Sequence, residues 1–356
     1  MTNQEASPAG SYTELSRAAK AAIAFVNREL GGLDGRPLEL DVCDNGFSAE
    51  QSISCAQRFV EAGVPAVLGG VDVFGTGISV LGQNGVPYVG GIPISDESAT
   101  SPTSFQWSGG TWGAAVAFAD HIASSGAKRA AMVHPDFGPI NEAAGMGRKV
   151  LDGAGVATTD VPYPITGTDL TPALQAAVAP DPDALIVLGA DTMCRSAIDA
   201  ARDLGITATM YYLGACASPT VTSQFPPEVL EGAYFNVEGP ISADDPDTVL
   251  YGAVMERYAR DVDAVGAATV AFRSTINLYR ALRSIDARPI TADAVRAALG
   301  SQVSTPSFMG HPSTCDHRQI EGLPAMCSPQ QILVEMHDGT LRQRGTWVDV
   351  GAVLSR

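Results

Sequence analysis

The chain has 356 residues, of which 45% are hydrophobic and 17% charged, and its formal net charge is −17. This length suggests about two domains with buried cores, and the acidity argues against a nucleic-acid partner, because phosphates need a basic surface. No apolar run approaches the roughly 20 residues that are needed to span a bilayer.

Short apolar strands alternate with helices along most of the chain, which predicts an α/β fold with parallel sheets covered on both faces. Before Pro240 the expected strands are Leu38–Cys43, Ala66–Gly69, Tyr88–Gly90, Arg129–His134, Ala184–Leu188, Thr209–Leu213 and Gly232–Asn236. The expected helices are Ala18–Glu29, Ala49–Ala62, Ile78–Asn84, Trp112–Ser124, Asn141–Ala154, Leu170–Ala179 and Cys194–Leu204. After Pro240 we expect helices Asp247–Asp261, Val265–Arg283 and Thr291–Leu299, then a hairpin of Gln331–Met336 with Arg342–Val348.

Six cysteines form three pairs that are local in the sequence, without CxxC or zinc-ribbon spacing. An even number in this arrangement favours disulfides, and therefore a protein that works outside the cytoplasm. Because each pair joins neighbouring loops or a strand end to the next helix, we predict the bonds Cys43–Cys55, Cys194–Cys216 and Cys315–Cys327. An alternative for the last pair is a zinc site made by His311, Cys315, His317 and Cys327.

Catalytic motifs are hard to find. Gly75-Thr76-Gly77 lacks the third glycine of a dinucleotide-binding loop, and no serine occupies a Gly-x-Ser-x-Gly turn. His134 ends a predicted strand, and we interpret it as a hydrogen-bonded strand-end residue rather than a general base. The sequence therefore predicts no enzyme, cofactor or metal. A Rossmann-type oxidoreductase stays open as the alternative enzyme hypothesis.

A set of segments, in order, resembles the type I periplasmic substrate-binding proteins of ABC importers, in the branch of the leucine/isoleucine/valine-binding proteins. The segments are Ala18–Asn27, Gly31–Leu40, Cys43-Asp44, Ala56–Val60, Ala62–Val64, Gly69-Gly70, Gly85–Pro87, His134–Gly138 and Ala201–Gly205. The resemblance implies two Rossmann-like lobes joined by three crossovers, near Trp107–Gly110, Glu238–Pro240 and Gln319–Leu323. The lobes would be residues 1–108 with 240–318, and 109–239 with 319–356.

The same resemblance implies a monomeric, extracytoplasmic protein that closes on a small molecule and delivers it to an ABC permease. A sensory module of the same fold, acting on a signalling partner, is the alternative. Family members begin with an apolar strand, whereas Met1–Gly10 is polar and lacks the features of a signal peptide. We therefore expect that the first strand and the signal sequence are missing from this chain.

Ligands of open α/β sheets lie beyond the carboxyl ends of the strands. The loops expected there are 3–12, 71–75, 91–95, 136–140, 190–193 and 215–218. From them we take the candidate ligand-binding residues Tyr12, Asp72, Val73, Phe74, Ile92, Pro93, Ile94, Ser95, Phe137, Asp191, Thr192, Cys216 and Ala217. Asp72 and Asp191 could instead be helix caps.

Three candidates depart from the pattern of the amino-acid-binding members. Those members carry a small hydroxyl residue, a threonine and a glutamate where this chain has Val73, Ile94 and Cys216. The resemblance therefore implies a ligand other than a branched-chain amino acid. Amides, urea, aromatic acids and other small organic molecules remain open.

Overall fold

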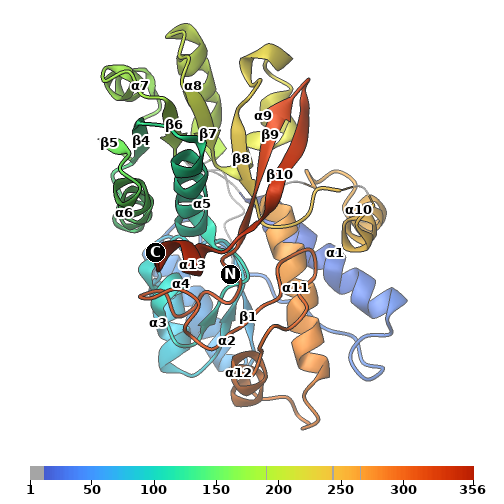
Figure 1. Ribbon diagram of the computed structural model, residues 1–356. Helices are drawn as coiled ribbons and strands as arrows, with labels where there is room; N and C mark the ends of the chain where they lie inside the picture. The colour runs from blue at the N-terminus through green and yellow to red at the C-terminus, as the bar shows by residue number, and fades with distance from the viewer. Residues whose placement is uncertain (1–11, 190, 243, 265) are drawn as a thin grey trace. The chain divides into compact units, whose positions relative to one another are not determined.

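A computed structural model describes residues 12–189, 191–242, 244–264 and 266–356 (Figure 1). The described chain divides into two compact units. Unit 1 contains residues 12–109 and 239–329, and unit 2 contains residues 110–238 and 330–356. Each unit is therefore assembled from segments that are distant in the sequence.

Unit 1 is built around a parallel sheet in the order β1-β2-β3, with Val67 opposite Tyr88 and Val89 opposite Phe105. Its long helices α1 and α11 pack side by side (Figure 1), and their small and apolar faces form part of the core. The elements are α1 (Thr13–Glu29), α2 (Ala49–Glu61), β1 (Val67–Leu68), α3 (Thr76–Gln83), β2 (Tyr88–Val89), α4 (Asp96–Thr100), β3 (Ser104–Phe105), α10 (Pro246–Tyr258), α11 (Ala267–Arg283) and α12 (Ala292–Gly300).

The strand expected at Leu38–Cys43 is not formed. The side chain of Asn27 occupies both backbone groups of Leu38: its Oδ1 accepts from the Leu38 amide at 2.7 Å, and its Nδ2 donates to the Leu38 carbonyl at 2.9 Å. A cavity of about 210 Å³ lies between residues 38–42, residues 64–69 and the helices α1 and α11. An extended segment needs a neighbouring strand to form a ladder, and no described strand forms a ladder with residues 38–43.

Unit 2 is built around a seven-stranded sheet in the order β10-β9-β8-β7-β6-β4-β5. The strands β4 to β8 are parallel, and β9 and β10 are antiparallel to their neighbours. The helices are α5 (Gly110–Ser125), α6 (Gly138–Gly153), α7 (Thr171–Val178), α8 (Asp191–Asp203), α9 (Pro219–Thr222) and α13 (Val350–Leu354), with short 3₁₀ turns η1 (Gly214–Ala217) and η2 (Pro227–Val229). The strands are β4 (Arg129–Pro135), β5 (Ala157–Tyr163), β6 (Ala184–Val187), β7 (Thr209–Tyr212), β8 (Tyr234–Val237), β9 (Gln331–His337) and β10 (Thr340–Val348).

The strand order places helices on both faces of this sheet. The chain moves from β4 through α6 to the edge strand β5, and then in the opposite direction through α7 to β6. Because such crossovers are right-handed, α6 and α7 cover opposite faces. The α/β fold with parallel-rich sheets is thereby confirmed.

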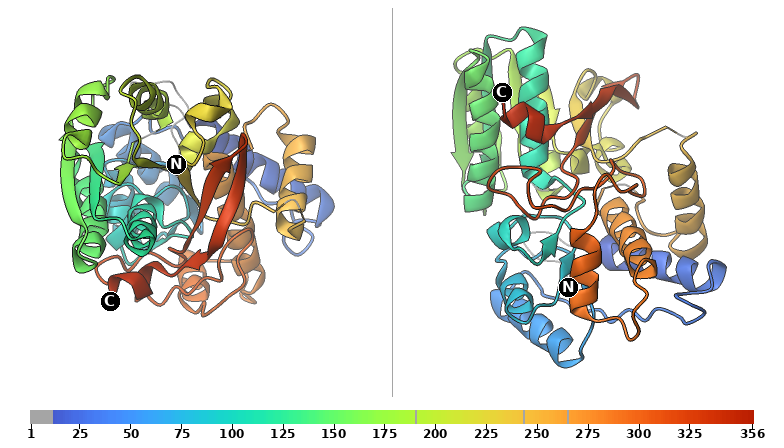
Figure 2. Two further views of the ribbon diagram at one scale, coloured as in Figure 1. Left: turned by 45° about the horizontal axis from the view of Figure 1, so that its top comes forward. Right: turned by 60° about the horizontal axis from the view of Figure 1, so that its bottom comes forward.

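The C-terminal hairpin is also confirmed. Figure 2 shows β9 and β10 as paired arrows that lead into α13. Asp338 and Gly339 both have positive φ, which suits the right-handed twist of the paired strands. Two helices after Pro240 begin at capping side chains: the Asp245 carboxylate accepts from the Thr248 amide at the start of α10, and the Thr291 hydroxyl accepts from the Ala294 amide at the start of α12.

Several elements lack a counterpart among the expected strands and helices: the strands β3 and β5 and the short helices α4, α9 and α13. The strand β5 lies at an edge of its sheet, and most of its residues are only half-buried. An edge strand of this kind, which also contains Pro162, has no continuous apolar run to reveal it.

The last boundary between the units lies after Pro329, later than the crossover expected at 319–323. Backbone hydrogen bonds explain the shift. The Gln106 amide donates to the Ala325 carbonyl, and the Cys327 amide donates to the Gln106 carbonyl, both at 2.8 Å. These bonds keep the polar loop that contains Cys315 and Cys327 in unit 1.

Candidate functional site

The loops after β1 and β2 meet at the carboxyl edge of the sheet in unit 1. The Ile92 amide donates to the Gly70 carbonyl at 2.9 Å. Buried Asn45 holds the first loop from behind, because its Nδ2 donates to the Val71 carbonyl at 2.7 Å. The sequence candidates at 72–74 and 92–95 are therefore brought together on one edge.

The side chain of Asp72 caps the N-terminal end of α3 from the preceding loop, whereas the N-cap residue itself is Gly75. Asp72 is only 2% exposed, and its Oδ2 accepts from the amides of Gly77 at 3.1 Å and Ile78 at 3.2 Å. Burial raises the pKa of the Asp72 carboxyl above its ordinary value. The capping interpretation explains all of these contacts.

Ser95 is likewise a structural cap. Its hydroxyl accepts from the Ser98 amide, and the Ser98 hydroxyl accepts in turn from the Ser95 amide. This capping box starts α4 and leaves Ser95 buried. Pro93 is also buried, so neither side chain has much surface to offer a ligand.

The other candidates in unit 1 are apolar and more open. Val73, Ile92 and Ile94 are half-buried and pack against the core that contains α1 and α11. Phe74 is 50% exposed. The ring of Tyr12 packs edge-to-face against Phe47 with 6.0 Å between the centroids, and this second aromatic was missed by the sequence reading. Residues 3–11 of the first candidate loop lie outside the described residues.

The candidates of unit 2 follow β4, β6 and β7. Half-buried Phe137 precedes α6, and next to it Asp136 accepts from Asn141 Nδ2 at 2.9 Å. Asp191 and Thr192 start α8, but their side chains lie outside the described part of the chain, as does residue 190. Cys216 and Ala217 form the turn η1 and are 3% and 5% exposed.

Tyr163 is a candidate that the sequence reading missed. It ends β5 opposite Pro135, and it is only 6% exposed. Its hydroxyl is buried and has no hydrogen-bond partner among the described residues, and it lies 3.3 Å from where a Cβ on Gly189 would lie. Burial raises the pKa of Tyr163 well above its usual range, so the hydroxyl is a neutral donor. A buried hydroxyl without a partner, at the edge where ligands of such sheets bind, is a candidate ligand contact.

His134 has the structural role expected for a strand-end residue. Its Nδ1 lies 3.0 Å from the Pro135 carbonyl, and its Nε2 lies 3.1 Å from Asp160 Oδ1. Asp160 also accepts from Arg148 at 2.7 Å. With both ring nitrogens engaged, the contacts of His134 are those of a buried structural group.

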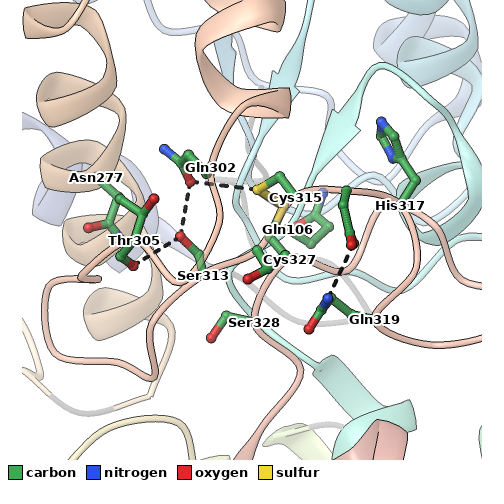
Figure 3. The surroundings of a disulfide bond; sticks show 12 residues. Gln106, Asn277, Gln302, Thr305, Ser313, Cys315, His317, Gln319, Cys327 and Ser328 are labelled. Atoms are coloured by element: carbon green, nitrogen blue, oxygen red, sulfur yellow. Dashed lines mark hydrogen bonds between the residues drawn. A yellow bond between two sulfur atoms is a disulfide. The ribbon is translucent and has the colours of Figure 1, made fainter.

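All three predicted disulfides are confirmed, with Cα–Cα distances of 5.7 Å for Cys43–Cys55, 5.2 Å for Cys194–Cys216 and 4.4 Å for Cys315–Cys327. The zinc alternative for the last pair is wrong, because both sulfurs are in the bond. Figure 3 shows this disulfide beside Gln302, whose Oε1 accepts from the Ser313 hydroxyl at 2.9 Å. The bond belongs to the framework of the loop.

None of the helices in the described ranges is both long and apolar enough to cross a membrane.

The sequence model of a family described as periplasmic binding protein matches residues 3–326. No curated protein is significantly similar to the chain in sequence.

Many solved structures share the fold. The branched-chain amino acid transporter substrate-binding protein LivJ from Streptococcus pneumoniae, in complex with isoleucine, has 15% identity and a TM-score of 0.77, with 97% of each chain covered. A substrate-binding periplasmic protein from Ralstonia solanacearum has 19% identity and a TM-score of 0.80, covering 94% of this chain and 96% of that one. A fatty acid ABC transporter substrate-binding protein from Thermomonospora curvata has 14% identity and a TM-score of 0.77, covering 99% and 91%.

Proposed function

The chain belongs to the periplasmic binding protein family, and we propose that it is an extracytoplasmic solute-binding protein that captures a small organic molecule for an ABC importer. The observation that carries the proposal is the match of the family model over residues 3–326. The members of this family are binding proteins rather than enzymes. The three disulfides favour an oxidising compartment.

The names of the solved structures do not select the ligand. One of them binds isoleucine and another is described as a fatty acid transport protein, although both share the fold. Since fold does not fix ligand chemistry, we propose only that this chain binds a small organic molecule. Its identity depends on the residues at the sheet edges.

We propose that the loops at the carboxyl edge of each sheet supply the ligand contacts. In unit 1 the proposed contacts are Tyr12, Val73, Phe74, Ile92 and Ile94. In unit 2 they are Phe137, Tyr163, Asp191 and Thr192. The exposed ring of Phe74 and the unpartnered hydroxyl of Tyr163 support this choice.

Native mass spectrometry of the full chain, folded with its disulfides intact, tests the proposal. A bound ligand should appear as a discrete mass increase that disappears on denaturation, and the released compound can then be identified. As a control, the same compound added to stripped protein should restore the mass increase and raise the melting temperature. Failure to find any small molecule that binds, across preparations from cells and a metabolite library, would contradict the proposal.

A further inference from the structure

The N-terminal end of α3 lies at the carboxyl edge of the sheet in unit 1, where a helix could hold an anionic ligand group through its free amides. In this chain, carboxylates of the protein already lie there. Asp72 accepts from the amides of Gly77 and Ile78. A Cβ added at Gly75, the residue before α3, would overlap the carboxylate of Glu97.

In the next loop along this edge, the backbone amides also have acceptors within the protein. The amides of Ile94 and Ser95 both donate to the Ser98 hydroxyl at 3.1 Å. The first turn of α4 carries the acidic residues Asp96 and Glu97. These negative charges would repel a ligand carboxylate.

Positive charge is also absent from the sequence around these loops. Residues 59–127 contain no lysine or arginine, and they include both loops and all three strands of the sheet in unit 1. Arg273 of α11 is only 1% exposed and packs against Gly310. A ligand carboxylate would therefore meet acidic groups at this edge and no exposed cation from these residues.

Apolar side chains belong to the same loops. Val73 and Phe74 follow β1, Ile92 and Ile94 follow β2, and Tyr12 packs against Phe47; we call these six residues the apolar edge. Five of these side chains are half-buried against the core, and Phe74 extends further into solvent. Because the rings and branched side chains are anchored from behind, covering them would bury apolar area with little ordering of the protein.

We propose that unit 1 receives an apolar, uncharged part of the ligand on the apolar edge and that its described residues offer no site for a ligand carboxylate. The occupant is an aromatic or branched aliphatic group, as in a neutral amide, rather than the zwitterionic end of an amino acid. This inference rests on the proposed function and narrows the class of its ligand.

Three matched sets of compounds test it by calorimetry on the full chain. Leucine and phenylalanine supply zwitterions, 4-methylpentanamide and 3-phenylpropanamide supply neutral amides, and 3-methylbutylamine and 2-phenylethylamine supply cations. The neutral amides should bind at least tenfold more tightly than the amino acids, whose carboxylates the acidic groups at this edge repel. Tighter binding of the amines than of the amides would overturn the claim that the bound group is uncharged. Tighter binding of the amino acids would overturn the inference and leave the binding function standing, whereas no binding by any compound would count against both.

Three variants locate the contact. Phe74→Ala should weaken binding of the neutral amides about tenfold, because the exposed ring supplies apolar contact area. The control Val303→Ala removes another exposed apolar side chain of the same unit and should leave binding unchanged. Glu97→Gln should also leave binding of the amides unchanged. A tenfold loss on Glu97→Gln would show that this carboxylate contacts the ligand and would overturn the inference.

Discussion

Replacing Tyr163 with phenylalanine tests whether the Tyr163 hydroxyl contacts the ligand or instead stabilises the fold. The substitution removes one buried hydroxyl that has no hydrogen-bond partner in the described part of the chain and keeps the ring in place. An unsatisfied buried hydroxyl costs about 1–3 kcal/mol. The free energy of unfolding of the ligand-free Tyr163→Phe protein should therefore stay unchanged or rise by about 1 kcal/mol. If the hydroxyl donates to the ligand, affinity should fall about tenfold, which corresponds to roughly 1.4 kcal/mol.

The assay is urea denaturation of the ligand-free proteins together with calorimetry using the ligand identified by mass spectrometry. Tyr211→Phe is the matched control, since the Tyr211 hydroxyl lies 2.9 Å from His121 Nδ1 within the same unit. That variant should lose about 1 kcal/mol of stability and keep its affinity. Lower stability with unchanged affinity for Tyr163→Phe would refute the reasoning, because it would show that the hydroxyl has a structural partner.

Three further predictions concern stability. Asp72→Ala should lower the free energy of unfolding by about 1–2 kcal/mol in urea titrations. Asp72→Asn should lower it less, because an amide oxygen can still accept from the Gly77 and Ile78 amides. Equal losses for the two variants would argue against a capping role of Asp72. Burial lowers the pKa of His121 from its ordinary 6.5, so the stability it contributes is present above pH 6.5 and is lost as the pH falls through the native pKa. His121→Asn should therefore flatten this part of the pH dependence of the urea midpoint, and an unchanged profile would contradict the assignment. Ala19 lines the cavity beside residues 38–42, so Ala19→Leu should fill it and stabilise unit 1 by about 1 kcal/mol. The control Ala22→Leu, at a fully buried position outside the cavity lining, should destabilise unit 1 by about 1–3 kcal/mol. The reverse order of melting temperatures would contradict the packing argument.

The sequence predicts those features that depend on local chemistry. Ala184–Val187 is a continuous apolar run, and it forms a strand buried at every position. Asp245 and Thr291 precede helices and cap them. The three disulfides follow from cysteines placed on neighbouring elements, because a short connecting loop keeps the partners within reach.

Features that depend on distant partners could not be predicted. Residues 38–43 have the composition of a strand, but Leu38 binds the distant Asn27 side chain, and no described strand forms a ladder with this segment. Glu97 reaches the N-terminal end of α3 only because Gly75 leaves room for its carboxylate. That the Tyr163 hydroxyl is buried without a described partner can be seen only in the folded sheet, where β5 pairs with β4.

The covalent framework of unit 2 bears on how the candidate edge is held. Cys194 lies in the first turn of α8, after β6, and Cys216 lies in η1, after β7, so their bond joins two neighbouring loops at the carboxyl edge. The Gly214 amide donates to Asn236 Oδ1 at 2.8 Å, which ties the same turn to β8. Loops fixed in this way lose little conformational entropy when a ligand is bound. The disulfide therefore favours a preorganised edge in unit 2, on which the start of α8 and the turn η1 are held before any ligand arrives.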